Sequence, residues 1–338
     1  MTIKEAIQKT IEGVSLSQEE AHLVATEIME GQATDAQIAA LLMCLRLKGE
    51  TIDEITGFTK TMREKVTRIP CNAQNLVDTC GTGGDSSGTF NISTVSAIVA
   101  AGAGCIVAKH GNRSVSSQCG SADVLKALGV NLDITPEKAG ECIDQNGIGF
   151  LFAPLLHKAM KYAIGPRREV GVRTIFNILG PLTNPAGAHR QVMGVFHVDL
   201  TEPIANVLKK LGSEHVMVVH GEDGLDEMTL TGKTRVSELK DGVVQTYDLD
   251  PTSFGFTLAS PDDLKGGDAE QNAAIVQAVL QGKKDGKRDT VVLNAGAVIY
   301  VGGKAPSIQA GMQLAEQAID SGAALQKLEM LVTLTNEN

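Results

Sequence analysis

The sequence contains no tryptophan, and aromatic residues make up only 3% of its 338 residues. Its 30 basic residues are outnumbered by 40 acidic ones, which gives a net charge of −10. Proteins that bind nucleic acids typically present a basic surface, and those that bind single strands add aromatic side chains on which bases stack. The composition therefore argues against a nucleic-acid partner.

The metal-binding patterns of cysteine and histidine are missing as well. The six cysteines form no CxxC pair, and the seven histidines form no HExxH motif and no i, i+4 pair. This excludes the usual zinc-site patterns and favours oxygen ligands for any metal. A cytoplasmic chain of this size needs no disulfides for its stability, so we expect reduced thiols.

Long apolar runs and a secretory signal are also absent. The run AIVAAGAGCIVA contains glycines and is well short of the roughly 20 residues that cross a membrane. The segment MTIKEAIQKTIEG is charged and lacks the apolar stretch of a signal peptide. We therefore expect a soluble cytoplasmic protein with no membrane partner. Its 43% of hydrophobic residues suffices for a core of two domains, or of one domain with a subdomain.

Residues 1–68 carry the signals of a small, all-helical domain. Three apolar segments each follow a hydroxyl residue that has Glu or Gln three positions later, which is the capping box of a helix N-terminus: Ser17 with Glu20, Thr34 with Gln37, and Thr51 with Glu54. Glycines 31 and 49 end two of these helices. The segment Arg68-Ile69-Pro70 breaks the pattern, so we place a domain boundary there and expect a second domain over residues 70–338.

From residue 76 onward, short β-branched runs alternate with helical segments. LVDTC, GCIVA, QVMGVFHV and VMVVH predict buried strands, while STVSAIVAA and EPIANVLKKLG are typical of helices. TVVLNAGAVIYV fits a strand or a helix. Such alternation predicts an α/β domain with a mostly parallel central sheet flanked by helices. A helical segment near residues 160–182 interrupts it, and we expect this segment to join the helical domain.

Three polar segments follow predicted strands. They are the glycine loop GTGGDSSGTFNIST at residues 81–94, KHGNRSVSS at residues 109–117, and HGEDGLDE at residues 220–227. The carboxyl ends of parallel strands meet at one edge of a sheet, where ligands bind in such folds. The sequence therefore predicts that the three segments converge on one ligand site.

The glycine loop has the features of an anion site. Gly81, Gly83 and Gly84 allow the backbone to approach a ligand closely, and Ser93 and Thr94 open the next helix, whose free N–H groups favour phosphate. Two adjoining anion sites suit a ligand with two phosphate groups. The alternative is an ordinary glycine-rich connection in which Ser93 only caps the helix.

Charged residues in the other segments fit the same ligand. Lys109 is placed to contact a phosphate, and the adjacent Asp226 and Glu227 offer oxygen ligands to a Mg²⁺ ion that bridges substrate phosphates. Arg167 and Arg168 suit the carboxylate of a second substrate. In isolation each segment is equally compatible with a solvated surface turn or helix face.

The motifs GTGGD with TFNIST, KHGNRS with SSQCGSADVLKALG, GPRREVGVRTIFNILGPLTNP, and DGLDE occur in this order. In this they resemble the anthranilate phosphoribosyltransferase family. The resemblance implies an N-terminal helical domain hinged to an α/β domain, and a homodimer formed through the helical domains. It also implies transfer of phosphoribose from 5-phosphoribosyl 1-pyrophosphate to the amine of anthranilate in tryptophan biosynthesis. Two Mg²⁺ ions are expected, one of them bridging the pyrophosphate.

The resemblance also assigns site residues. Residues for anthranilate are Gly81, Asn112 and Arg167, and those for Mg²⁺ are Ser93, Asp226 and Glu227. The phosphoribosyl donor is expected to contact residues of the glycine loop and of the segment after the second strand: Gly81, Gly84, Asp85, Thr89, Asn91, Ile92, Ser93, Thr94, Lys109, His110, Gly111, Asn112, Arg113, Ser114, Val115, Ser116, Ser117 and Ser121.

Departure of pyrophosphate is expected to leave an oxocarbenium-like centre on the ribose, with negative charge on the leaving group stabilised electrostatically. No covalent intermediate is needed, and His110 is a candidate catalytic base. The alternatives are a pyrimidine nucleoside phosphorylase of the same fold, a nucleic-acid-binding relative, and a scaffold protein. Phosphorolysis of a nucleoside would favour the first alternative and tight DNA binding the second, whereas a scaffold leaves the three polar segments unexplained.

Overall fold

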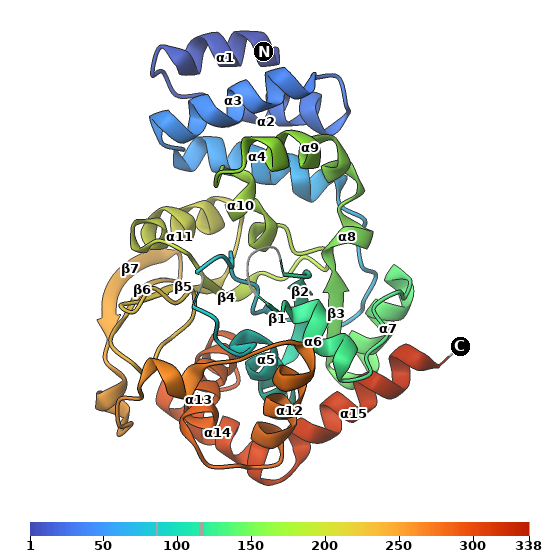
Figure 1. The fold of residues 1–338 in the computed structure, drawn as a ribbon, viewed down its shortest axis with the longest axis vertical. Helices are drawn as coiled ribbons and strands as arrows, with labels where there is room; N and C mark the ends of the chain where they lie inside the picture. The colour runs from blue at the N-terminus through green and yellow to red at the C-terminus, as the bar shows by residue number, and fades with distance from the viewer. Residues whose placement is uncertain (86, 115–117, 338) are drawn as a thin grey trace.

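The computed structural model describes residues 1–85, 87–114 and 118–337 (Figure 1). A bundle of helices lies at one end of the molecule, and a larger α/β domain built on a seven-stranded sheet lies below it (Figure 1). This confirms the predicted fold class. None of the described helices is long and apolar enough to span a membrane.

The bundle consists of α1 (Ile3–Ile11), α2 (Gln18–Met29), α3 (Asp35–Lys48) and α4 (Ile52–Lys65). The three predicted capping boxes are all present, and Thr2 with Glu5 forms a fourth at the start of α1. Helix α9 (Lys161–Val170), which lies far along the chain, packs against α3 (Figure 1).

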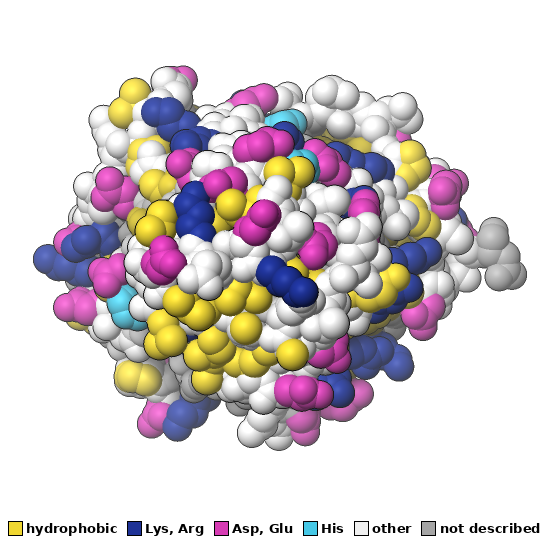
Figure 2. All heavy atoms as spheres, turned by 90° about the horizontal axis from the view of Figure 1, so that it is seen from above, with side chains coloured by type: hydrophobic (Ala, Val, Ile, Leu, Met, Phe, Trp, Pro, Cys, Tyr) yellow, Lys and Arg dark blue, Asp and Glu magenta, His cyan; other side chains and the backbone are white. Residues whose placement is uncertain are grey.

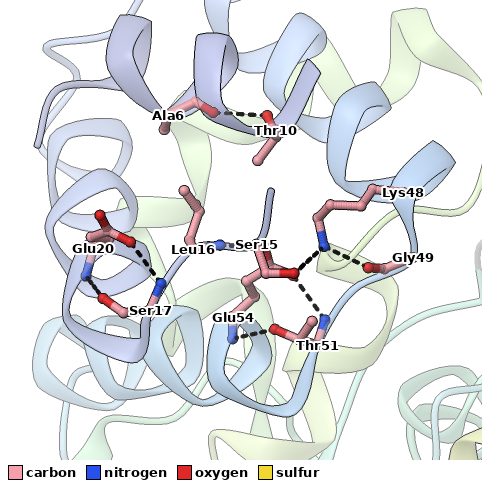
Figure 3. Close-up of polar contacts among 10 residues, drawn as sticks. All are labelled: Ala6, Thr10, Ser15, Leu16, Ser17, Glu20, Lys48, Gly49, Thr51 and Glu54. Atoms are coloured by element: carbon pink, nitrogen blue, oxygen red, sulfur yellow. Dashed lines mark hydrogen bonds and ion pairs between the residues drawn. The ribbon is translucent and has the colours of Figure 1, made fainter. Parts of the chain in front are cut away.

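A buried ion pair holds the bundle together at the start of α4 (Figure 3). The Glu54 carboxylate is fully buried and accepts hydrogen bonds from the backbone N–H groups of Leu16 and Thr51, at 2.9 and 2.8 Å. It also accepts one from Lys48 Nζ at 2.9 Å. Glu54, the carboxylate of the α4 capping box, thus ties the end of α3 to the connection that precedes α2.

The sheet has the strand order β3-β2-β1-β4-β5-β6-β7. Strands β3, β2, β1, β4 and β5 are parallel, whereas β6 and β7 extend the sheet as antiparallel strands. The strands are β1 (Leu76–Asp78), β2 (Ile106–Gly111), β3 (Ile148–Phe152), β4 (Arg190–Gly194), β5 (His215–Gly221), β6 (Thr234–Lys240) and β7 (Val243–Leu249).

Helices cover both faces of the sheet. One face packs against α5 (Ile92–Gly102), α12 (Ala269–Leu280), α13 (Gly286–Val301), α14 (Ile308–Asp320) and α15 (Ala323–Asn336), and α6 (Ser121–Ala127) joins this core. The other face packs against α7 (Pro136–Asn146) and α8 (Ala153–Leu156) beside β1 to β3, and against α11 (Thr201–Lys210) beside β4 to β6. The ambiguous run TVVLNAGAVIYV is helical and forms most of α13.

The second hydrophobic core is shared between the bundle and the sheet. Apolar residues of α2, α3 and α4 belong to the same cluster as those of α11, β4 and β5, and the short helix α10 (Phe176–Leu179) lies between them. An edge-to-face contact of Phe58 with Phe176, at 6.1 Å between ring centroids, is part of this connection. The carboxyl edge of the sheet therefore faces the bundle across α10 (Figure 1).

Candidate active site

The three polar segments meet at the carboxyl edge of the sheet. The glycine loop leaves β1 and is joined to the end of β4 by a hydrogen bond from the Thr82 N–H to the Gly194 carbonyl, at 2.9 Å. The Gly83 N–H donates to Asp226 Oδ2 at 2.6 Å, which joins the loop to the segment after β5. Lys109 and His110 belong to β2 itself, whereas the sequence pattern places them just after the strand. Their side chains are therefore fixed by the sheet.

Glycine is required where the loop and the acidic segment touch. A Cβ atom on Gly194 would lie only 1.4 Å from the Asp226 carbonyl oxygen, and one on Gly81 would lie 3.0 Å from Asp226 Oδ2. Gly83 and Gly84 have φ of 65° and 81°, which disfavours residues with side chains. The role of Gly194 is not visible in the sequence, because an isolated glycine at the end of a strand has many uses.

Lys109 is the cation at the centre of the site. It is 3% exposed, and its Nζ donates to Thr79 Oγ1 at 2.9 Å and lies 3.5 Å from Ser93 Oγ. The ammonium group thus lies between the start of the glycine loop and the first turn of α5. Both are places where a phosphate would bind.

The predicted metal ligands Asp226 and Glu227 lie close to Asp85 of the glycine loop. Burial, followed by the negative charge of Asp85, raises the pKa of Asp226 to about 7, although the Gly83 N–H opposes the shift. Burial and the adjacent Asp226 carboxylate raise the pKa of Glu227 well above its usual range, against the opposing charge of Lys109. Carboxylates that disfavour one another's ionisation in this way are stabilised by a bound cation.

These residues fit Mg²⁺ better than a metal held by protein alone. Among the described residues, no three His, Cys, Asp or Glu side chains are arranged to hold a metal ion. Mg²⁺ is typically bound through one or two carboxylates together with waters and substrate phosphates. Ser93, the third predicted ligand, is within reach because its backbone hydrogen-bonds Glu227 and lowers the pKa of that carboxyl.

His110 is paired with His157, a residue that sequence reasoning did not select. The two Nε2 atoms are 3.1 Å apart, and His110 is 2% exposed. Burial, and then His157, lowers the pKa of His110 to about 3, while burial lowers the pKa of His157 to about 4. The Gly180 carbonyl opposes the shift of His110, although its Nδ1 atom has no partner of full hydrogen-bond geometry among the described residues. Both rings are therefore neutral at pH 7, and His110 is a weak base.

Arg167 lies near the end of α9, where the bundle faces the α/β domain. Its guanidinium lies 5.5 Å from the centre of the Phe176 ring, and burial lowers its pKa. No acidic partner for it occurs in the described part of the chain, whereas Arg168 is exposed. Arg167 is therefore available to an anionic ligand. Asn112, its predicted companion, is exposed, and no hydrogen bond joins the two.

The other predicted donor residues divide into ligand-facing and supporting groups. Asn91 is held by Cys119 and Asn272, and Gly111 lies so near Ser121 that a Cβ atom would come within 2.4 Å of its hydroxyl. Ile92 and Thr94 are buried inside α5. The remaining described residues are exposed or half-buried around the same edge: Thr89, Arg113 and Ser114. Val115, Ser116 and Ser117 lie outside the described residues.

Arg173 is a further residue of the site that was not among the predicted site residues. Its guanidinium donates to the Gly84 carbonyl and lies 4.4 Å from the centre of the Phe196 ring. The segment after α9 thus reaches the glycine loop directly. The sequence signal was available, because Arg173 belongs to the basic cluster that includes Arg167.

Comparison with known proteins agrees with this geometry. Residues 4–66 match the sequence model of the glycosyl transferase family, helical bundle domain, and residues 73–325 match that of the glycosyl transferase family, a/b domain. The chain is 57% identical to the anthranilate phosphoribosyltransferase of Acetivibrio thermocellus over 99% of this chain and 97% of the relative. It is 55% identical to that of Alkaliphilus metalliredigens over 99% of both chains.

Solved structures give the same result. The crystal structure of the enzyme from Thermus thermophilus has a TM-score of 0.94 and 45% identity, over 98% of this chain and 99% of that one. The enzyme from Saccharomyces cerevisiae, in complex with PRPP (5-phosphoribosyl 1-pyrophosphate) and Mg, has a TM-score of 0.89 and 26% identity, over 98% and 97%. Because these relatives and structures match nearly the whole chain, the chain belongs to the anthranilate phosphoribosyltransferase family.

Proposed function

We propose that the protein transfers the 5-phosphoribosyl group of 5-phosphoribosyl 1-pyrophosphate to the amine of anthranilate. The products are N-(5-phosphoribosyl)anthranilate and pyrophosphate, and the step belongs to L-tryptophan biosynthesis in the cytoplasm. The observation that carries the proposal is the convergence of the glycine loop, Lys109 and three carboxylates on one sheet edge. Relatives that match nearly the whole chain and carry the name of this activity support it.

The phosphoribosyl donor binds between the glycine loop and the first turn of α5. A glycine-rich loop and a helix N-terminus both favour anions, and Lys109 supplies a fixed positive charge between them. Asp226 Oδ2 holds the Gly83 N–H, and this fixes the shape of the loop. The donor phosphates thus meet groups that are already in position, which lowers the entropic cost of binding.

Ser93, Asp226 and Glu227 would hold Mg²⁺, with Asp85 nearby. A Mg²⁺ ion held there would supply positive charge to the leaving pyrophosphate. Three carboxylates in the cluster would suit two Mg²⁺ ions, and one of these would contact the pyrophosphate. A Mg²⁺ complex with the yeast relative supports the choice of metal.

The transfer itself depends on positioning and electrostatics. The bond from ribose C1 to the pyrophosphate oxygen breaks, and the anthranilate nitrogen forms the new bond to C1 from the opposite side. Lys109 and the loop N–H groups stabilise the negative charge that develops on the leaving group. Because no side chain must form a covalent bond, the low pKa of His110 is no obstacle.

Anthranilate binds under the bundle, where Arg167 meets its carboxylate and Asn112 and Gly81 complete the site. The neutral His110–His157 pair adds no positive charge near the ribose cation. A proton leaves the amine after attack. We propose His110 as the group that receives it, and its pKa of about 3 makes it a weak base.

The active form is a homodimer joined through the helical domains. Figure 2 looks onto the bundle end of the molecule and shows hydrophobic side chains gathered on that face. Ile11, Val14 and Leu47 are 66%, 47% and 81% exposed at neighbouring ends of α1 and α3. Apolar side chains grouped in this way favour burial against a second copy.

The proposal is tested by following anthranilate fluorescence with purified protein, 5-phosphoribosyl 1-pyrophosphate and Mg²⁺. Consumption must require all three, and it should fall by more than about 100-fold in the Asp226→Asn/Glu227→Gln variant. Glu222→Gln is the matched control, since this exposed side chain lies in the same acidic turn and outside the carboxylate cluster. A folded wild type that leaves anthranilate untouched but cleaves a nucleoside with inorganic phosphate would overturn the proposal.

A further inference from the structure

Asp78, at the carboxyl end of β1, is completely buried and has no salt-bridge partner among the described residues. Its Oδ1 atom accepts three backbone N–H groups, from Thr79 at 2.7 Å, Cys80 at 3.1 Å and His110 at 3.1 Å. Its Oδ2 atom accepts the side-chain amide of Asn184 at 2.7 Å. A carboxylate with four donors is held in one orientation, so it fixes the position of each donor as well.

Those donors come from three separate parts of the chain. Thr79 and Cys80 begin the glycine loop, and His110 lies at the end of β2. Asn184 lies in the connection from α10 to β4, on the route by which the chain returns from the bundle. Its Nδ2 also donates to the Ala108 carbonyl at 2.8 Å, and its Oδ1 accepts the Ala186 N–H at 2.9 Å. The carboxylate and the amide thus join all three segments beneath the ligand site.

Thr79 connects this pair to the groups that face the ligand. While its N–H is held by Asp78, its hydroxyl accepts from Lys109 Nζ at 2.9 Å and donates to the Ser93 carbonyl at 3.2 Å. A displaced Thr79 would therefore move the Lys109 ammonium away from the first turn of α5. Asp78 also holds the backbone N–H of His110, and the side chain of that residue contacts His157.

We propose that Asp78 and Asn184 are positioning residues for the phosphoribosyl donor, and that they hold Lys109 and the entry of the glycine loop in the geometry that binds the donor phosphates. The inference rests on the proposed function and deepens it, because neither side chain touches the ligand. A merely structural pair would contribute to folding and leave donor affinity unchanged.

The test is Asp78→Asn in the full-length protein. The new amide keeps an oxygen for the backbone donors but places its NH₂ against the Asn184 NH₂, so two donors face each other. Donor binding with Mg²⁺ is measured by calorimetry, both KM values by anthranilate fluorescence, and stability by thermal unfolding. We expect the Kd and KM for the donor to rise by about tenfold or more. The KM for anthranilate should rise less than the KM for the donor, because Arg167, the residue proposed to bind its carboxylate, belongs to α9, which packs against the bundle.

The matched control is Asn146→Ala, which removes a buried amide that donates to the Lys327 carbonyl at 2.9 Å, far from the site. It should lower stability and leave donor binding as in the wild type. If Asp78→Asn does not fold, Asn184→Ala keeps the carboxylate with its three backbone donors and should weaken donor binding in the same direction.

Two failures are distinguishable. The positioning role alone is overturned if the wild type is active and the Asp78 and Asn184 variants are less stable but bind the donor normally. The same holds if they lose no more donor affinity than Asn146→Ala. A wild type that neither binds the donor nor consumes anthranilate would overturn the proposed function, and the positioning role with it.

Discussion

Replacing Gly194 by alanine is the sharpest test of how the site is built. Gly194 ends β4, and an added Cβ atom would lie 1.4 Å from the Asp226 carbonyl oxygen and 2.3 Å from its carbonyl carbon. Non-bonded atoms rest at roughly 3.5 Å, so the Asp226 backbone would have to move by about 2 Å. Overpacking of this kind typically costs about 1–3 kcal/mol of stability.

The larger effect is expected on activity. A displacement of about 1 Å in a catalytic group costs on the order of 100-fold in rate, so Gly194→Ala should lower kcat/KM by at least about 100-fold. It should also raise the Mg²⁺ concentration needed for half-maximal activity, because the displaced group is a predicted metal ligand. Initial rates over a Mg²⁺ titration, together with urea unfolding, measure both effects.

Gly286→Ala is the control, because a Cβ atom there meets only ordinary contacts, 3.6 Å from Asp263 and 3.8 Å from Ala259. It opens α13, where alanine is a good helix former, so stability should be equal or slightly higher. The reasoning is refuted if Gly194→Ala stays within about threefold of the control in activity and within about 0.5 kcal/mol in stability. The close approach of β4 to the acidic segment would then not organise the site.

Three further predictions concern the pH dependence, the dimer and the bundle. The pKa of His157 is about 4, below its ordinary value, so the unfolded chain binds the extra proton and the wild type loses stability as pH falls below about 6.5. His157→Gln removes this loss. The difference in unfolding free energy between wild type and variant, measured with urea, should therefore fall by up to about 2 kcal/mol from pH 7 to pH 5. A difference that stays constant with pH would refute the lowered pKa of His157. Leu47→Glu, at an 81% exposed position, should give a folded monomer in analytical ultracentrifugation, and an unchanged sedimentation coefficient would place the interface elsewhere. Lys48→Met leaves the buried Glu54 carboxylate without its cation and should cost about 3–5 kcal/mol in urea unfolding, whereas a loss below about 1 kcal/mol would show that the two backbone donors suffice.

The helical domain was predictable because its signals are local. Each capping box is complete within four residues, so the sequence at Ser17, Thr34 or Thr51 determines the helix start without help from the rest of the chain. The same pattern at Thr2 and Glu5 went unrecognised although it is equally clear.

The sheet was predictable only in part. β6 and β7 form an antiparallel extension at one edge, and most residues of β7 are exposed or half-buried, so no buried apolar run marks that strand. Helix α13 could not be told from a strand, because it is buried all round and its sequence shows no amphipathic period. In both cases tertiary packing decides the structure, and that packing comes from segments far away in the sequence.

The site shows the same division between local and distant information. Residues of the glycine loop and of the acidic segment could be selected because their types are unusual in a run. Asp78, Asn184 and Gly194 could not, since each is a single ordinary residue whose function arises from backbone groups of other segments. Sequence patterns therefore reveal the groups that meet the ligand better than the groups that hold them.

Energetics explains why such supporting residues should be sought among buried acids. Burial raises the pKa of Asp78 to about 6 even though three hydrogen-bond donors and the charge of Lys109 act against the shift, so desolvation outweighs these favourable contacts. A core selected for stability alone would place an apolar side chain there. The presence of a carboxylate indicates that fixing Thr79, His110 and Asn184 matters more to this protein than the stability that it loses.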